Sequence, residues 1–468
     1  MSGILTAIKL TVLGLEFTVF EKAERVGGTW RENTYPGLSC DVPSHAYTYS
    51  FARNPEWSQW YAPGAEIQAY FQRIADDHGV TPLVRFGDEV TSLEFGDGAW
   101  DLRTAAGFEG RFEVVIAATG VLHHPNIPEF AGLDTFAGSS FHSARWDHSV
   151  PLDGKRVGVI GAGSTAVQIT SALVDRVESF DLFQRTPQWV LAGDSKVFSD
   201  EEKAAYRDDP ESLETFVAQV KKSMKDGISS AVIDAESPQL AKLEHLCEKN
   251  LDTVRDPQLR ERLRPTYRAA CKRLIFSPDF YEAIQRPNAN LVTAGIDRVE
   301  PAGVRTNDGV LHELDVLVLA TGFQVDRFVR PMRVIGRDGI DLDDAWADGP
   351  VAHLSISVPG FPNFFMLNGP NGPVGNFSLI DVAELQLGYI LQLIAPMVEG
   401  RYQEVSPTAA ATDAFEIERR AAAAKTVWST GCQSWYLDRH GVPATWTFSW
   451  DRFCDEMHEP KLAAYELR

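Results

Sequence analysis

Cysteine is scarce in this chain. The 468 residues contain five cysteines, and no two of them stand in a C-x-x-C spacing. An odd number of scattered cysteines does not predict a disulfide framework, and no His and Cys cluster has the spacing of a zinc site. The sequence therefore favours a reduced, cytoplasmic protein without a bound metal.

Basic charge and long apolar runs are also in short supply. Asp and Glu number 65 against 44 Lys and Arg, which leaves a net charge of −21. Nucleic acid and anionic membranes repel a strongly acidic protein, so we expect neither as a partner. No uninterrupted apolar run reaches the roughly 18 residues that span a bilayer, and no signal-peptide pattern opens the chain. The oligomeric state stays open.

One sequence pattern, an apolar stretch followed by Thr-Gly, occurs twice in the chain. Two apolar stretches, 114–118 and 316–320, each continue into a Thr-Gly pair, Thr119-Gly120 and Thr321-Gly322. Each pattern predicts a buried parallel strand that ends in a small turn at the carboxyl edge of a sheet, where open α/β folds bind nucleotides. The chain is also too long for one core. We therefore expect an α/β fold with two Rossmann-like dinucleotide-binding domains.

The first twenty residues resemble the second half of a Rossmann unit. Apolar residues at helical spacing end at Gly14, and residues 17–20 predict a strand that ends at Glu21. Gly3 stands where the third glycine of G-x-G-x-x-G belongs, and Glu21 stands where an acidic side chain accepts hydrogen bonds from a ribose. The first strand and first two glycines are absent. We expect the coding sequence to continue upstream, and a chain that begins at Met1 to bind its dinucleotide weakly.

The second Rossmann unit is complete. Gly161-x-Gly163-x-x-Ala166 follows a predicted strand and opens a predicted helix. The next strand ends at Arg185-Thr186 rather than at an acidic residue. A guanidinium there favours the 2′-phosphate of NADPH over the free ribose of NADH; the alternative is a solvated surface arginine.

The segment between the two units carries a specific spacing. Residues 136–147 read F-x-G-x-x-x-H-x-x-x-W-D, and residues 27–41 read G-G-x-W, then Y-P-G, then Asp. Both motifs resemble those of Baeyer–Villiger monooxygenases, flavoenzymes that insert oxygen beside a ketone carbonyl. We expect His142 and Trp146 to fix the orientation of the domains rather than to catalyse. The resemblance covers nearly the whole chain.

The resemblance implies a division into domains and a reaction. Residues 1–148 would form the first part of an N-terminally incomplete FAD-binding domain, and 149–345 an NADP-binding domain with a helical insertion at about 195–265. Residues 346–468 would return to the FAD domain and end in a tail. NADPH would reduce FAD, O₂ would add to the flavin, and the C4a-peroxyflavin would attack a ketone to give an ester or lactone.

The resemblance also assigns the site residues. Arg273 would be the fixed cation beside the reacting oxygen, and Asp41 would orient it through a charge-assisted pair. Lys272 would join Arg185 around the 2′-phosphate. The alternatives are a surface basic pair and a turn-capping Asp41. The other cofactor-binding candidates are Gly28, Thr29, Trp30, Tyr47, Val90, Thr119, Gly120, Ser164, Thr165, Gln168, Thr186 and Trp435.

Two other functions fit the same motifs. The first is a flavin monooxygenase that oxidises nitrogen or sulfur, with an amine or thioether in place of the ketone. The second is a truncated, catalytically impaired flavoprotein that binds only NADP. A flavoprotein disulfide reductase is not expected, because such an enzyme needs a redox cysteine pair that the sequence does not reveal.

Overall fold

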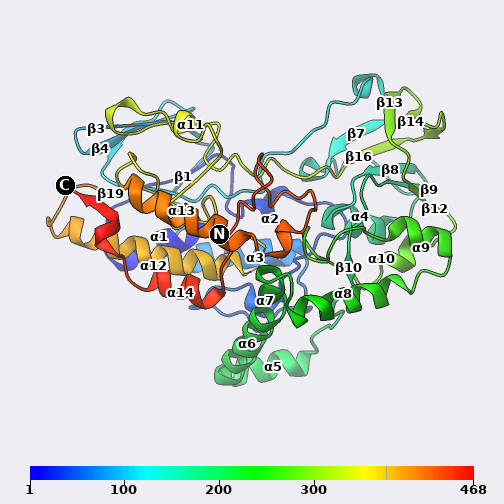
Figure 1. The fold of residues 1–468 in the computed structure, drawn as a ribbon, viewed down its shortest axis with the longest axis horizontal. Coiled ribbons are helices and arrows are strands. Elements are labelled where there is room, and N and C mark those ends of the chain that lie inside the picture. The colour runs from blue at the N-terminus through cyan, green and yellow to red at the C-terminus, as the bar shows by residue number, and fades with distance from the viewer. Residues whose placement is uncertain (376) are drawn as a thin grey trace.

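The computed structural model describes residues 1–375 and 377–468. Two α/β bodies lie side by side, and a group of helices extends below their junction (Figure 1). One body contains both ends of the chain, and the other contains its middle.

The middle body is built on a five-stranded parallel sheet. Its order is β12-β9-β8-β16-β7, the arrangement of a doubly wound nucleotide-binding fold. β8 and β16 are buried along most or all of their length because helices such as α4 cover one face of the sheet and strands β13 and β14 pack on the other. The bounds are β7 (Ser139–His142), β8 (Arg156–Ile160), β9 (Ser179–Phe183), β12 (Ala289–Val292) and β16 (Val316–Leu319). The predicted second Rossmann unit is confirmed.

Short elements complete this body. Helix α4 follows β8, and an antiparallel three-stranded sheet, β13-β14-β15, packs on one face of the main sheet (Figure 1). The bounds are α4 (Ser164–Leu173), β10 (Val190–Leu191), β11 (Ile275–Phe276), α10 (Phe280–Ala283), β13 (Ile296–Glu300), β14 (Gly303–Thr306) and β15 (Leu311–Glu313).

The body that holds both termini contains two parallel strand pairs with an open space between them. β1 pairs with β2, and β6 pairs with β18. Among the described residues, β1 and β6 do not pair with each other. The bounds are β1 (Val19–Glu21), β2 (Val84–Phe86), β6 (Val115–Ala117) and β18 (Phe364–Met366). The order of a doubly wound sheet leaves room for one strand between β1 and β6.

A mixed sheet, β17-β3-β4-β5, covers the upper part of this body. Its strands are β3 (Val90–Gly96), β4 (Ala99–Thr104), β5 (Glu109–Phe112) and β17 (Arg333–Ile335). The strand pairing shows where the chain crosses between the bodies. β7 already belongs to the second sheet, and β17 already belongs to the first body. The chain therefore crosses before residue 139 and returns before residue 333, earlier than the expected boundaries at 149 and 345.

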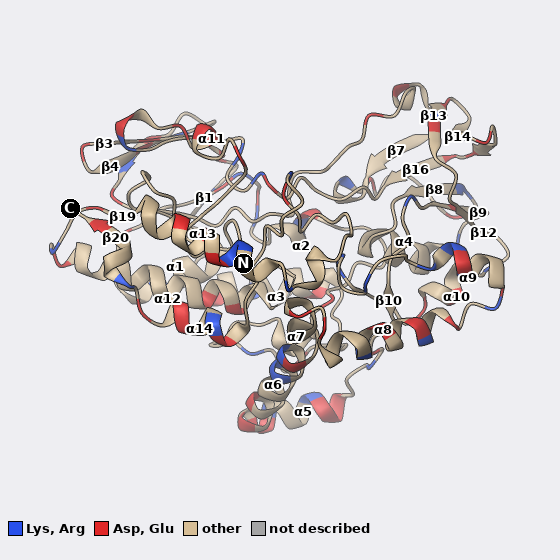
Figure 2. Cartoon of the chain, viewed as in Figure 1, with Lys and Arg blue, Asp and Glu red and all other residues tan. Residues whose placement is uncertain are grey.

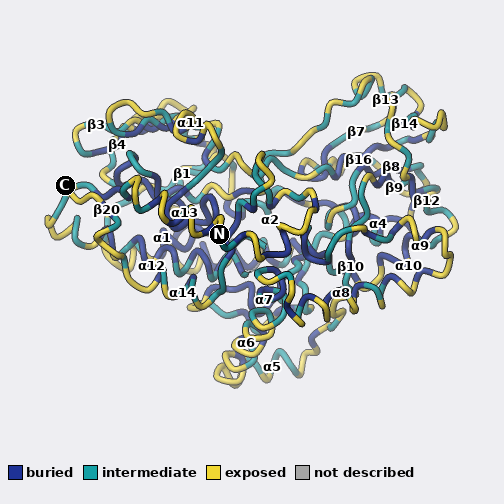
Figure 3. The backbone as a smooth tube through the Cα atoms, viewed as in Figure 1, coloured by how far each residue is buried: buried dark blue, intermediate teal, exposed yellow. Residues whose placement is uncertain are grey.

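Helices fill the core of the first body. Apolar side chains of α1, α3, α12 and α14 pack in one buried cluster (Figure 3). α12 is long and apolar enough to cross a membrane, by those two criteria alone. Its inward face is buried against α1 and α14, as in the core helix of a globular protein. The bounds are α1 (Ser2–Val12), α2 (Thr29–Glu32), α3 (Gly64–Asp77), α11 (Leu342–Ala345), α12 (Leu379–Val398), β19 (Val405–Pro407), α13 (Ala409–Ala423), α14 (Trp450–His458) and β20 (Tyr465–Leu467).

The insertion is helical, as predicted. A capping box between Ser199 and Glu202 starts its first helix, and proline occupies the first turn of three others. The helices are α5 (Asp200–Asp208), α6 (Pro210–Met224), the π-helical turn η5 (Lys225–Ser229), α7 (Ser230–Ile233), α8 (Pro238–Leu251) and α9 (Pro257–Leu263). Lys, Arg, Asp and Glu are interspersed along its outer surface (Figure 2).

One expectation about cysteine is wrong. Cys271 and Cys432 form a disulfide, and the other three cysteines are free. The two partners are 161 residues apart, so no local spacing in the sequence predicts that they pair. A redox-capable cysteine pair therefore exists where the sequence predicted none.

Candidate active site

An arginine–aspartate pair lies at the junction of the two bodies and the insertion. Nε of Arg273 donates to Oδ2 of Asp41 at 2.8 Å, and a terminal nitrogen donates to Oδ1 at 2.5 Å. Burial opposes the charge of Arg273, but Asp41 and the Tyr436 hydroxyl outweigh it and raise the pKa of the guanidinium. The predicted pair is therefore formed, and its arginine is a permanent cation.

A small cavity adjoins this pair. It measures about 50 Å³ and is lined by Asp41, Lys272, Arg273 and Tyr436 together with apolar side chains. Much of the apolar lining comes from the insertion and from the C-terminal part of the chain (Met224, Ile228, Val232, Phe377 and Trp428), and the rest comes from Val42 and from the segment around Arg273. Three side chains of the insertion therefore face the same cavity as the arginine.

Tyr436 is a member of this site that the sequence analysis missed. Its hydroxyl hydrogen-bonds with Arg273. A Cβ on Gly375 would lie 2.1 Å from the same hydroxyl, and Gly375 has a φ of +93°, so glycine makes room for the tyrosine. The neighbouring Trp435, predicted to bind cofactor, is 38% exposed and lies against Tyr436 with ring centroids 4.0 Å apart.

Two cations face each other beside the second sheet. Arg185 is exposed just beyond β9. Burial, and then the charge of Arg185, lower the pKa of Lys272. The Lys272 ammonium also lies 5.0 Å from the ring centre of Tyr267. Two like charges that act on each other favour an anion between them, which is what the predicted 2′-phosphate site requires.

The glycine turn of the second unit is tight, and its helix start is open. Gly161 has a φ of +141°, and a Cβ there would lie 2.2 Å from the carbonyl oxygen of Ala320. A Cβ added at Gly163 would meet no atom within 4 Å, and this glycine precedes α4, whose N-terminus carries no side-chain cap. Ser164, Thr165 and Ala166 form the first turn of α4. Free backbone N–H groups at such a turn bind phosphate.

Gln168, a predicted cofactor contact, is hydrogen-bonded to the Y-P-G loop. It accepts a hydrogen bond from Tyr35 at 2.8 Å and donates to the carbonyl oxygen and hydroxyl of Ser39, both at 3.1 Å. The hydroxyl of Thr165 donates to the same tyrosine at 3.3 Å. α4 is thus bonded to the Y-P-G loop of the first body.

A large cavity occupies the first body. It measures about 1010 Å³ and extends between β1 and β6. Its lining includes most of the residues predicted to bind FAD: Gly3, Glu21, Gly28, Thr29, Trp30, Tyr47, Val90, Thr119 and Gly120. The structure therefore brings these residues, which span 118 positions, around one space.

The lining of this cavity fits a dinucleotide. Ser2 and Gly3 bring the N-terminus of α1, which no side chain caps, to its wall. Gly28 and Gly120 have positive φ and no atom within 4 Å of an added Cβ, so backbone can approach a flat ligand there. Glu21 accepts a hydrogen bond from the backbone N–H of Ala23 at 2.9 Å and remains partly exposed to the cavity.

The linker motif is structural. Nδ1 of His142 accepts a hydrogen bond from the N–H of Ala144 at 3.1 Å, and Nε2 lies 3.1 Å from the carbonyl oxygen of Gly322. Burial lowers the pKa of His142, so the ring is neutral at pH 7. Trp146 packs against Phe141, with ring centroids 5.0 Å apart. These contacts lie within the middle body, so the role of His142 and Trp146 in fixing the orientation of the domains stays a prediction.

Known proteins share this arrangement. The family described as flavin-binding monooxygenase-like matches residues 1–331. A Baeyer–Villiger monooxygenase of Streptomyces coelicolor is 37% identical over 475 residues, which cover 99% of this chain and 90% of the relative. A Baeyer–Villiger monooxygenase of Pseudomonas aeruginosa is 34% identical over 447 residues and covers 93% of this chain and 83% of the relative.

Solved structures of monooxygenases have the same fold as this chain. Cyclohexanone monooxygenase from Rhodococcus sp. Phi1 bound to NADP⁺ matches with a TM-score of 0.89 at 29% identity. OTEMO in complex with FAD and NADP matches with a TM-score of 0.90 at 27% identity. Each match covers 100% of this chain and 97% of the other. Two dinucleotide folds with an arginine–carboxylate pair at their junction define a flavin-dependent monooxygenase. The chain belongs to the flavin-binding monooxygenase-like family and is an enzyme of Baeyer–Villiger type.

Proposed function

We propose that the protein binds FAD and NADPH and uses O₂ to convert a ketone into an ester or lactone, with water and NADP⁺ as the other products. When bound, FAD reduced by NADPH supplies the activation of O₂. The Asp41–Arg273 pair beside an apolar cavity is the observation that carries the proposal.

Arg273 provides positive charge where negative charge develops on oxygen. Its raised pKa means that it stays protonated and does not supply a proton to that oxygen. Asp41 fixes the plane of the guanidinium through two hydrogen bonds. We assign the catalytic role to Arg273 and the orienting role to Asp41.

The remaining residues divide between the two cofactors. Arg185, Lys272 and the first turn of α4 would hold NADPH, with Thr186 and Trp435 beside it. The N-terminus of α1, Glu21 and the Gly28–Trp30 turn would hold FAD, with Thr119 and Gly120 at the opposite wall.

The substrate would be an apolar ketone. Methionine, isoleucine, valine, leucine and four aromatic side chains line the cavity beside Arg273, and such a surface binds hydrocarbon better than charged groups. We also propose that the enzyme works in the cytoplasm.

A substrate comparison tests the proposal. The FAD-loaded protein is given NADPH, O₂ and, in turn, a cyclic ketone, an alkyl thioether and a tertiary amine of similar size. Lactone formation at a rate above sulfoxide or N-oxide formation supports the proposal. Sulfoxide or N-oxide with no lactone favours heteroatom oxidation. A folded, colourless protein that takes up no flavin favours the impaired NADP-binding alternative.

A further inference from the structure

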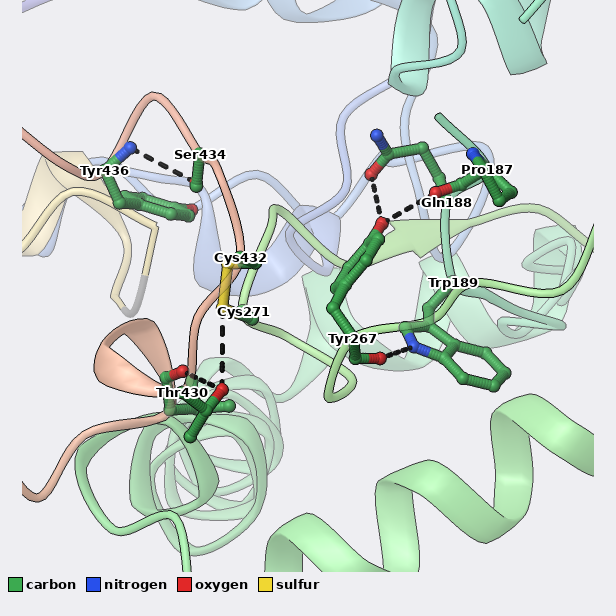
Figure 4. Close-up of a disulfide and its surroundings, with 10 residues drawn as sticks. Pro187, Gln188, Trp189, Tyr267, Cys271, Thr430, Cys432, Ser434 and Tyr436 are labelled. Carbon is green, nitrogen blue, oxygen red and sulfur yellow. Dashed lines mark hydrogen bonds between the residues drawn. A yellow bond between two sulfur atoms is a disulfide. The ribbon is translucent and has the colours of Figure 1, made fainter. Parts of the chain in front are cut away.

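The disulfide connects two segments that both reach the candidate active site. Cys271 immediately precedes Lys272-Arg273, and Cys432 lies just before Ser434-Trp435-Tyr436 (Figure 4). Their Cα atoms are 6.2 Å apart. The bond therefore limits how far the basic loop and the aromatic loop can separate.

The aromatic loop has local hydrogen bonds but few to the basic loop. The N–H of Tyr436 donates to the Ser434 hydroxyl at 3.2 Å, and the N–H of Leu437 donates to the Ser434 carbonyl at 3.1 Å. These bonds form a turn within the loop. Besides the disulfide, Tyr436 contacts Arg273, Thr430 donates a weak hydrogen bond to the Cys271 sulfur, and apolar side chains of both segments pack in one buried cluster.

Both sulfurs lie in the protein interior but close to its functional surface. Cys271 is fully buried and Cys432 is 6% exposed, while Lys272 and Arg273 line the small cavity and Trp435 is exposed. Breaking the bond would leave the two loops joined by the tyrosine–arginine contact and by apolar packing, without a covalent link. The cations that bind phosphate and the tryptophan beside them would then move more independently.

We propose that Cys271 and Cys432 form a reversible oxidation site for peroxide, and that the oxidised pair holds the aromatic loop against the basic loop in the arrangement that binds NADP. The binding half of this proposal rests on the proposed function. It concerns the chain's affinity for the nucleotide rather than the oxidation of the ketone.

The chemistry balances with hydrogen peroxide as oxidant. One thiolate attacks the peroxide O–O bond, gives a sulfenic acid and releases hydroxide. The second thiolate then attacks the sulfenic sulfur, the S–S bond forms, and the oxygen leaves as water after protonation. In sum, two thiols and one H₂O₂ give one disulfide and two waters. A dithiol reverses the change by thiol–disulfide exchange and is itself oxidised.

Cysteine counting tests the site. The FAD-loaded protein is first reduced with a dithiol, which is then removed; one half is treated with dilute H₂O₂ until the result stops changing, and both halves are denatured and alkylated with a maleimide for intact-mass measurement. The chain has five cysteines, of which two form the disulfide. We expect five labels after the dithiol and three after peroxide. Five labels after peroxide would overturn the proposal.

Nucleotide affinity tests the consequence. We expect the dithiol-treated protein to bind NADP⁺ about tenfold more weakly than the oxidised protein, because ordering roughly one more backbone residue costs a factor of this size. FAD content should be the same in both. Equal NADP⁺ affinities would overturn the proposal, whatever the protein does with ketones.

Two variants provide matched controls. Cys271→Ser/Cys432→Ser should take three labels in both conditions and bind NADP⁺ like the reduced protein, without a response to peroxide. Cys454→Ser removes a free, half-buried thiol on α14 and should keep the full response with one label fewer in each state. If the double variant does not fold, reduced wild-type protein gives the same comparison. A double variant that binds like the oxidised protein would contradict the proposal.

Discussion

Arg273 and Asp41 are 232 residues apart in the chain, yet two hydrogen bonds of 2.8 and 2.5 Å join them. The side chains are 29% and 24% exposed, so water is not fully excluded and a ligand can reach the arginine. The two hydrogen bonds fix the orientation of the guanidinium, and its partial exposure lets a ligand approach it. That combination suits a cation that acts on a reacting oxygen.

Replacing Arg273 should slow ketone oxidation strongly while the protein still binds its cofactors. We expect Arg273→Ala to lower kcat for ketone oxidation by about 10²- to 10³-fold, the usual loss when one stabilising group is removed from a developing oxyanion. Arg273→Lys should recover part of the rate, because it keeps the charge but loses the paired hydrogen bonds. Product formation by gas chromatography measures both.

The control for this experiment is Arg298→Ala, which removes an exposed arginine paired with Asp297 and Glu300. It should leave the rate unchanged. An undiminished rate of ester formation by Arg273→Ala would show that the charge at this position is not needed.

The proposed preference for NADPH over NADH should depend on Arg185. Lys272 already carries a pKa lowered by burial and by the charge of Arg185, so an anion between them relieves repulsion. We expect Arg185→Ala to raise KM for NADPH by roughly 10- to 100-fold, the worth of one charge-assisted hydrogen bond. KM for NADH should change little, because NADH has no 2′-phosphate.

Arg176→Ala offers a matched comparison for this prediction. Arg176 is half exposed in the same body and pairs with Asp153. Its loss should leave both KM values unchanged. If Arg185→Ala weakened NADPH and NADH equally, the residue would act on the shared part of the cofactor or on the fold.

The structural elements near local motifs could be predicted from the sequence, and the contacts between distant segments could not. The G-x-G-x-x-A spacing predicted β8 and α4 because a strand, a glycine turn and a helix each have a recognisable residue pattern, and all three patterns fall within a short stretch of sequence. The Cys271–Cys432 bond and the Tyr436–Arg273 contact leave no such mark, since each joins residues more than 150 positions apart. The contact between Asp41 and Arg273 could be predicted only from the resemblance to a known family, because nothing in the spacing of the two residues indicates it.

Strand order was also hidden from the sequence. β7 lies before the glycine motif in the chain but pairs at the edge of the second sheet, beside β16. Its four residues, Ser-Ser-Phe-His, carry no strong strand pattern. Pairing with an already formed parallel sheet therefore decides its conformation.

Acid should weaken the contact between the bodies through Glu32. The carboxylate pairs with Arg31 at 3.0 Å, with Arg145 of the linker at 3.2 Å and with His123 at 3.6 Å. Burial raises the pKa of Glu32, but these partners outweigh it and lower the value to about 2 from 4.5. A lowered pKa stabilises the fold above pH 4.5, and the contribution disappears as the pH falls toward 2.

Denaturant unfolding of Glu32→Gln at two pH values measures this. At pH 7 we expect the variant to be less stable than wild type by about 3 kcal/mol, the free energy that corresponds to such a shift. At pH 3 the difference should shrink to less than half. Glu109→Gln, which removes an exposed carboxylate paired with Arg103, should show almost no difference at either pH. A Glu32→Gln deficit that is the same at both pH values would contradict the prediction.

Gly37 should be needed for the contact between the Y-P-G loop and α4. It has a φ of +82°, and an added Cβ would lie 2.6 Å from the carbonyl oxygen of Gln168 and 3.0 Å from Cβ of Ala172. Gly37→Ala therefore adds a backbone penalty and pushes α4 away from the loop. We expect a loss of about 2–4 kcal/mol in the free energy of unfolding and a lower kcat, because Gln168 then loses its bonds to Tyr35 and Ser39.

Gly79→Ala separates the backbone penalty from the steric clash with α4. Gly79 has a similar φ of +65° at the end of α3, but no atom lies within 4 Å of an added Cβ. Its replacement costs only the backbone penalty, about 1 kcal/mol, and should leave kcat unchanged. Thermal unfolding and steady-state kinetics of the two variants give the comparison. Equal losses of stability, with kcat unaffected in both, would show that the approach of Gly37 to α4 does not hold the bodies together, and that the alignment of Arg273 with Asp41 depends on other contacts.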